Sequence, residues 1–164
     1  MGVQNKKLIK RPRNMKRITI ILLITVLASG LAVAQRPKWI PEGWLLFLKV
    51  KFEPKYFKEV DETFLAPVFP PSVKAKVGTE ISLSGYYMPF ELDEHRVILS
   101  KYPYAACFFC GGAGPESVVE IVFTDKAPKL EVDDVISVRG KLRLNDKDVE
   151  RMNFILYDAV LLEE

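Results

Sequence analysis

The chain has 164 residues, of which 49% are apolar, 11% aromatic and 27% charged. This length accommodates one domain with one hydrophobic core, and the composition excludes a disordered, collagen-like or disulfide-dense chain. Seven of the 24 basic residues and none of the 21 acidic residues lie in residues 1–34, so residues 35–164 hold 17 basic against 21 acidic residues. A mildly acidic domain argues against a nucleic-acid partner, because binding to a phosphate backbone requires clustered positive charge.

The N-terminal segment has the pattern of an export signal. Its seven Lys and Arg residues precede an apolar run over residues 18–34, which ends in Ala-Val-Ala. A basic region, an apolar region and an A-x-A junction predict a signal peptide over residues 1–34, cleaved after Ala34, and hence a periplasmic protein. The apolar run is also close to the shortest length that spans a bilayer, so retention of residues 18–34 as an inner-membrane anchor stays open.

Residues 35–77 predict an N-terminal extension rather than a separate domain. Apolar and polar side chains alternate over residues 44–53, which indicates a half-buried strand that Pro54 ends. Residues 55–66 are ambiguous and are compatible with one or two helical turns. The prolines at 67, 70 and 71 then argue against regular structure. We therefore expect one strand and a proline-rich segment wrapped on the domain that follows.

Residues 78–164 predict a small β-barrel. Residues 80–86 and 135–141 share the pattern Ile-Ser-(Leu/Val)-x-Gly, and a glycine within a strand marks a bulge or a bend. Three further strands are expected, over residues 95–101, 117–124 and 153–162. Five short strands, two of them bent, are typical of a five-stranded Greek-key barrel of the OB type. A sandwich normally has more strands, and a parallel α/β sheet would need long helices between the strands, so the predicted class is mainly β.

The most unusual composition lies between residues 86 and 116. Both cysteines of the chain form a single C-x-x-C there, followed by Gly-Gly-Ala-Gly, and seven of the 18 aromatic residues lie in residues 86–109. Because loops of unusual composition often carry function, we expect the working surface over residues 102–116. Aromatic side chains there either form a stacking platform or belong to the core. The candidate binding residues are Tyr86, Tyr87, Tyr102, Tyr104, Phe108 and Phe109.

Four interpretations of Cys107 and Cys110 are open. In an oxidising compartment the pair is expected to form a small-ring disulfide that stiffens the loop. As thiolates the two cysteines supply half of a zinc site, which His95 together with Glu116, Asp93 or Glu94 could complete, although the usual second C-x-x-C is missing. Thiol-disulfide exchange is the third interpretation, and unreactive free thiols are the fourth. Zinc is the only cofactor that these residues suggest, and a single histidine without a nucleophile motif predicts no catalytic set.

Several segments resemble a family of small exported bacterial proteins of unknown function. They are residues 85–89, 99–103, 107–117, 138–145 and 152–156. The similarity covers roughly residues 44–162, and its most specific motif is Cys-Phe-Phe-Cys-Gly-Gly-Ala-Gly-Pro-Glu. The resemblance implies export and an OB-fold-like core, and it supplies no catalytic residues. Related families appear beside ABC-type permease components and metal-linked transport genes, which favours the metal interpretation of the C-x-x-C and a transport system as a partner.

The sequence therefore predicts an exported, non-enzymatic binding or accessory module of the bacterial cell envelope. Its expected partners are other envelope proteins or a transport complex, and a structural disulfide is the first interpretation of its C-x-x-C. One alternative is an envelope metal-handling protein of the zinc type that uses Cys107 and Cys110. The other is a thiol-disulfide oxidoreductase that uses the same pair.

Overall fold

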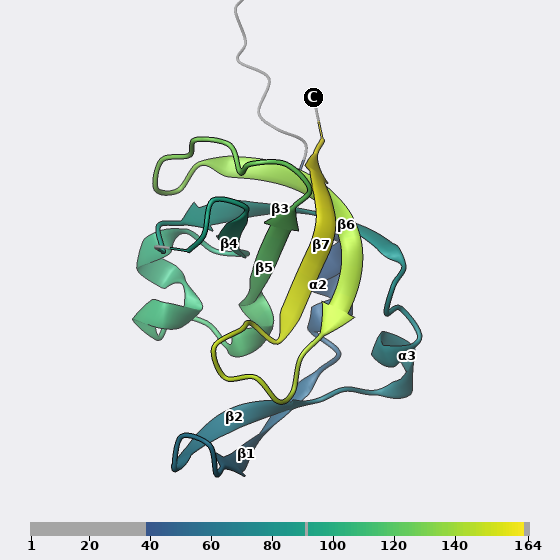
Figure 1. The fold of residues 1–164 in the computed structure, drawn as a ribbon, viewed down its shortest axis with the longest axis vertical. Helices are drawn as coiled ribbons and strands as arrows, with labels where there is room; N and C mark the ends of the chain where they lie inside the picture. Colours follow the sequence, from purple (N-terminus) through teal and green to yellow (C-terminus); the bar gives the residue numbers. More distant parts are fainter. Residues whose placement is uncertain (1–38, 91, 163–164) are drawn as a thin grey trace, which may run out of the picture. The chain divides into compact units, whose positions relative to one another are not determined.

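The computed structural model describes residues 39–90 and 92–162 (Figure 1). The helices are α2 (Glu42–Phe47), α3 (Pro71–Lys74) and the 3-10 helices η1 (Tyr104–Ala106), η2 (Phe108–Cys110) and η3 (Pro115–Ser117). The strands are β1 (Lys51–Phe57), β2 (Glu62–Val68), β3 (Glu80–Met88), β4 (Arg96–Ser100), β5 (Val118–Phe123), β6 (Val135–Leu144) and β7 (Phe154–Leu161). Among the described helices, none has the length and apolar character that a membrane crossing requires. The expected signal peptide or anchor lies outside the described residues.

Five strands close into a barrel in the order β3-β4-β5-β7-β6, with β6 pairing back to β3. Neighbouring strands are antiparallel except β5 and β7, which are parallel. Because β7 lies between β5 and β6, neighbouring strands in the barrel do not all follow each other along the chain. A Greek-key barrel has such a non-sequential strand order, whereas an up-and-down barrel does not. The predicted mainly β class and the closed five-stranded barrel are confirmed, and each strand lies within three residues of its expected bounds.

Both glycines of the repeated pattern lie where strands approach closely. Near Gly85, β3 passes from pairing with β6 to pairing with β4, and a Cβ at this position would lie 2.9 Å from the Cβ of Leu99. At Gly140 the register between β6 and β7 shifts, and a Cβ there would lie 3.1 Å from a carbonyl oxygen of β7. The missing side chains therefore permit the close strand contacts and bends that close the barrel.

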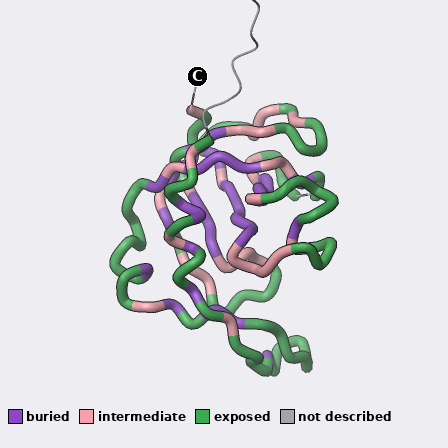
Figure 2. The backbone as a smooth tube through the Cα atoms, turned by 180° about the vertical axis from the view of Figure 1, so that it is seen from behind, coloured by how far each residue is buried: buried purple, intermediate pink, exposed green. Residues whose placement is uncertain are grey.

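The prediction of a strand over residues 44–53 is wrong. This segment begins with α2, and β1 begins only at Lys51. Trp44 and Phe47 face the core at the i, i+3 spacing of a helix, and neither is more than 1% exposed. Trp44 Nε1 donates a hydrogen bond of 2.7 Å to the carbonyl of Ser84, and Phe47 stacks on Phe154. The buried segments lie mostly on the strands of the barrel (Figure 2). Trp44 and Phe47 of α2 belong to the same apolar cluster as the buried side chains of these strands.

The expectations that Pro54 ends a strand and that the prolines at 67, 70 and 71 exclude regular structure are also wrong. β1 and β2 form an antiparallel hairpin that contains Pro54 and Pro67, and it includes most of the ambiguous residues 55–66. Among the described residues this sheet has only two strands, so each strand has an outer edge where a missing N–H breaks no ladder hydrogen bond. The hairpin projects from the barrel (Figure 1). Lys55 Nζ donates a hydrogen bond of 2.8 Å to the carbonyl of Asp146.

Candidate functional site

The loop between β4 and β5 contains the C-x-x-C. The sulfur atoms of Cys107 and Cys110 lie 3.7 Å apart and are not bonded to each other. Cys107 is fully buried, whereas Cys110 is exposed. A hydrogen bond with Cys107 raises the pKa of the Cys110 thiol. The two thiols are close enough for a small local movement to join them, but a raised thiol pKa does not favour the thiolate that thiol-disulfide exchange needs.

The structure does not bring His95 to the cysteines. The His95 carbonyl accepts a hydrogen bond from Phe123 N, at the end of β4 and β5 opposite to the cysteine loop. With five residues in β4, the separation along the strand is about 17 Å. His95 Nδ1 lies 3.0 Å from the carbonyl of Asp125, and the Glu116 carboxylate lies over the backbone of Gly114. Within residues 39–162 except 91, no group of three or more His, Cys, Asp or Glu side chains is placed to hold a metal ion.

Two of the predicted aromatic residues line cavities. Phe108 and Phe109 lie between the cysteines, with ring centroids 5.3 Å apart, and Phe90 contacts Phe109 at 4.4 Å. Phe108 lines a groove of about 340 Å³. Phe109 and Phe90 line a second pocket of about 160 Å³. The C-x-x-C loop therefore supplies a neighbouring aromatic side chain to each cavity.

The four predicted tyrosines lie outside both cavities. Tyr86 and Tyr87 are half-buried and pack against the two apolar clusters of the core. Tyr102 and Tyr104 are exposed on the cysteine loop. The structure therefore does not gather the six predicted aromatic residues into one surface.

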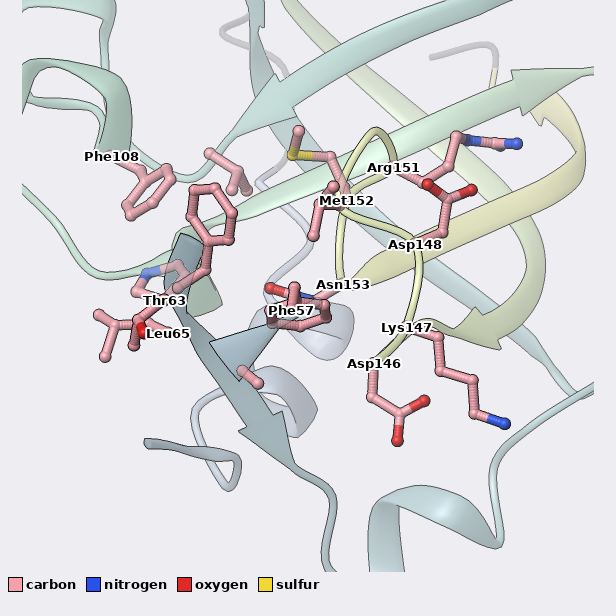
Figure 3. A pocket seen from close by; sticks show the side chains of 15 residues that line it. Phe57, Thr63, Leu65, Phe108, Asp146, Lys147, Asp148, Arg151, Met152 and Asn153 are labelled. Atoms are coloured by element: carbon pink, nitrogen blue, oxygen red, sulfur yellow. The ribbon is translucent and has the colours of Figure 1, made fainter. Parts of the chain in front are cut away.

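The larger cavity is a groove between the hairpin and the barrel (Figure 3). The hairpin forms one wall and contributes Phe57, Thr63 and Leu65. The opposite wall is the segment between β6 and β7, from Asp146 to Asn153, together with parts of the cysteine loop. Sequence reasoning missed the hairpin wall, because it did not predict β1 and β2 as a pair.

A buried carboxylate holds this second wall in place. Glu120 on β5 is 2% exposed and lies between two arginines. Arg151 Nη2 lies 2.6 Å from Oε1 and Arg151 Nε 2.8 Å from Oε2, and Arg96 Nη1 lies 3.3 Å from Oε1. Desolvation lowers the pKa of Arg96, but hydrogen bonds to Asp93 and Glu120 outweigh it and raise the pKa overall. The signal for this site was visible in the sequence, as a single acid within the apolar strand Val-Val-Glu-Ile-Val.

Comparisons with known proteins add a distant structural similarity. No protein-family model matches the chain, and no curated protein matches it. The fold is similar to the crystal structure of a DUF3299 family protein from Pseudomonas aeruginosa, with 20% sequence identity over 61% of this chain and 68% of that chain and a TM-score of 0.42. A similarity at this level carries no argument about function, so the class defined by the fold and the cavities is a small mixed β-barrel protein with an N-terminal hairpin.

Proposed function

We propose that this protein is a non-enzymatic binding module of the bacterial cell envelope whose partner occupies the groove between the hairpin and the barrel. The observation that carries the proposal is the groove of about 340 Å³ with large apolar side chains exposed at its border. Phe64 is 40% exposed and Leu65 is 53% exposed, and both line the groove. Apolar side chains that stay exposed beside a concave surface mark a binding site.

The charged contacts around the groove support a binding role rather than a catalytic one. Arg151 is paired with Glu120, and Lys55 is bonded to the main chain of Asp146. The Arg151–Glu120 pair holds the Asp146 to Asn153 wall against β5, and the Lys55 contact joins that wall to the hairpin, so both contacts position the walls of the groove. A disulfide between Cys107 and Cys110 would stiffen the same region further, because the pair flanks Phe108.

A hydrophobic dye tests whether the groove binds apolar groups. Residues 37–164 belong to one compact unit, so they can be produced alone. We expect 8-anilinonaphthalene-1-sulfonate to fluoresce with this protein and to lose most of its signal with Leu65→Asp, which places a carboxylate in the groove. The matched control is Leu48→Asp, because Leu48 is 50% exposed and does not line the groove. Equal signals from the two variants would contradict the proposal.

Cell fractionation tests the envelope part of the proposal. The basic and apolar segments of residues 1–34 support export, with envelope proteins or a transport complex as partners. We expect the native protein in the periplasmic fraction with a mass that begins at Gln35, or in the inner membrane with residues 18–34 retained. The same samples, alkylated with and without reductant, show whether Cys107 and Cys110 are joined. Soluble cytoplasmic protein that still carries Met1 would exclude the envelope location.

A further inference from the structure

We propose that the partner in the groove is an extended polypeptide segment that adds to β2 as a third strand of the hairpin sheet. This inference deepens the proposed function and rests on it, because it assumes that the groove is a binding site. It commits to a peptide backbone as the ligand, since the free edge of a strand presents a row of main-chain donors and acceptors. The position of the added strand depends on which edge of the hairpin is open and on what lies beside that edge.

The two prolines of the hairpin define which backbone groups point outward. Pro54 pairs with Leu65, and Pro67 pairs with Phe52, so both prolines fall on the same alternate set of pairs. In an antiparallel ladder only every second pair exchanges N–H···O hydrogen bonds. A proline has no N–H and therefore belongs in the pairs that exchange no hydrogen bonds. The main-chain groups of these pairs point away from the neighbouring strand. The outward-pointing residues are then Phe52, Pro54 and Tyr56 on β1, and Thr63, Leu65 and Pro67 on β2.

The outer edge of β1 is protected against strand addition. Pro54 removes the central outward donor of this edge, and Lys51 and Lys55 lie on either side of it. Proline and lysine on an edge strand are the residues that natural sheets use to prevent pairing with another chain.

The outer edge of β2 lacks this protection. Its proline is near the end of the strand, so Thr63 and Leu65 keep two consecutive outward N–H groups, and their neighbours are Phe64 and Ala66. Among the described residues, no hydrogen bond from outside the hairpin involves the backbone N–H of Thr63 or Leu65. The difference between the two edges shows that the open one is β2.

The open edge faces the groove. Thr63 and Leu65 both line it, and Figure 3 places them across from the Asp146 to Asn153 segment. An added strand would direct alternate side chains toward the apolar surface formed by Phe57, Phe108 and Met152. The occupant that we propose is therefore an extended segment of a partner, and pairing with the β2 of a second copy of this chain is an outcome that the test distinguishes.

The first experiment uses a peptide selected on the protein. A phage-displayed library of random nonapeptides is selected on residues 37–164, and the selected peptide is titrated by calorimetry. We expect methylation of every second peptide amide to weaken binding by about tenfold each, because each removes one main-chain hydrogen bond. Methylation of the intervening amides is expected to leave affinity within about twofold, because those N–H groups point away from β2. A methylation pattern without this alternation would overturn strand addition.

Two proline variants test the edge from the protein side. Thr63 and Tyr56 are cross-strand partners on the outward set of pairs, so proline at either position removes an outward N–H from one edge only. We expect Thr63→Pro to weaken the selected peptide at least about tenfold and Tyr56→Pro to leave it nearly unchanged. We expect the circular dichroism spectra of both variants to match that of the unmodified protein. Equal weakening by the two variants would overturn the assignment to β2.

The outcomes separate this inference from the proposed function. If the dye signal depends on Leu65 but no strand-like peptide is selected, strand addition fails and the groove remains a binding site. If the dye signal does not depend on Leu65, the proposed function itself fails. Analytical ultracentrifugation adds one further outcome: a dimer that Thr63→Pro dissociates would assign the edge to a second copy and overturn the partner segment.

Discussion

Truncation of Phe47 tests whether α2 is an integral part of the barrel core. Phe47 is 0% exposed, stacks on Phe154 with 4.0 Å between ring centroids and meets the edge of Trp44 at 5.8 Å. Removing a buried phenylalanine destabilises a protein by about 3–5 kcal/mol, and the loss of two aromatic contacts places Phe47→Ala near the upper part of that range. Such a loss is a large fraction of the 5–15 kcal/mol that is typical of a whole domain.

Urea denaturation of residues 37–164, followed by tryptophan fluorescence and circular dichroism, measures this change. With a dependence of about 2 kcal/mol per molar urea, we expect the midpoint of Phe47→Ala to fall by about 2 M. Leu48→Ala is the matched control, because Leu48 follows Phe47 directly but is 50% exposed, and it should change stability by less than about 0.5 kcal/mol. A loss below about 1.5 kcal/mol for Phe47→Ala would show that α2 is not anchored in the core.

Three further changes test other features. Gly85→Ala should destabilise the barrel by about 1–3 kcal/mol in thermal melting, because the new Cβ overlaps a β4 side chain; an unchanged melting temperature would contradict the close approach. Glu120→Gln should cost about 2 kcal/mol and speed hydrogen exchange in residues 145–153, since Arg96 and Arg151 lose their carboxylate while keeping some access to water; unchanged exchange would exclude a role in holding that wall. A hydrogen bond from Lys126 lowers the pKa of Glu94, so the Glu94 carboxylate contributes its full stabilisation above pH 4.5 and loses it as the pH falls through the lower folded-state pKa. Glu94→Gln should therefore reduce the fall in melting temperature at acid pH. A curve of melting temperature against pH that runs parallel to that of the unmodified protein would refute this.

The barrel was predictable because its strands carry local signals. Residues 80–86 and 135–141 share the pattern Ile-Ser-(Leu/Val)-x-Gly, and the glycine of each lies where neighbouring strands pass closely. The helix α2 was not predictable in this way. Over six residues, a run such as Trp-Leu-Leu-Phe fits a helix and a strand equally well, and the contact of Phe47 with Phe154, more than a hundred residues later, decides between them.

The candidate site was predictable only on the barrel side. The unusual C-x-x-C loop did indicate a surface of interest, and Phe108 and Phe109 line the two cavities. The residues do not reveal the hairpin wall, because Pro54 and Pro67 argue against strands. Whether a proline disrupts a strand depends on whether that strand has an outer edge. Whether an edge exists is a property of the assembled sheet and is not visible in the residues of one strand.

The position of β7 has a consequence for how the chain reaches its final form. This last strand lies between β5 and β6, which both precede it in the chain. Until residues 154–161 have been synthesised, β5 and β6 lack the strand that pairs with both of them, and the barrel cannot close. Barrel closure therefore depends on contacts between segments that lie far apart in the sequence, and such contacts slow folding.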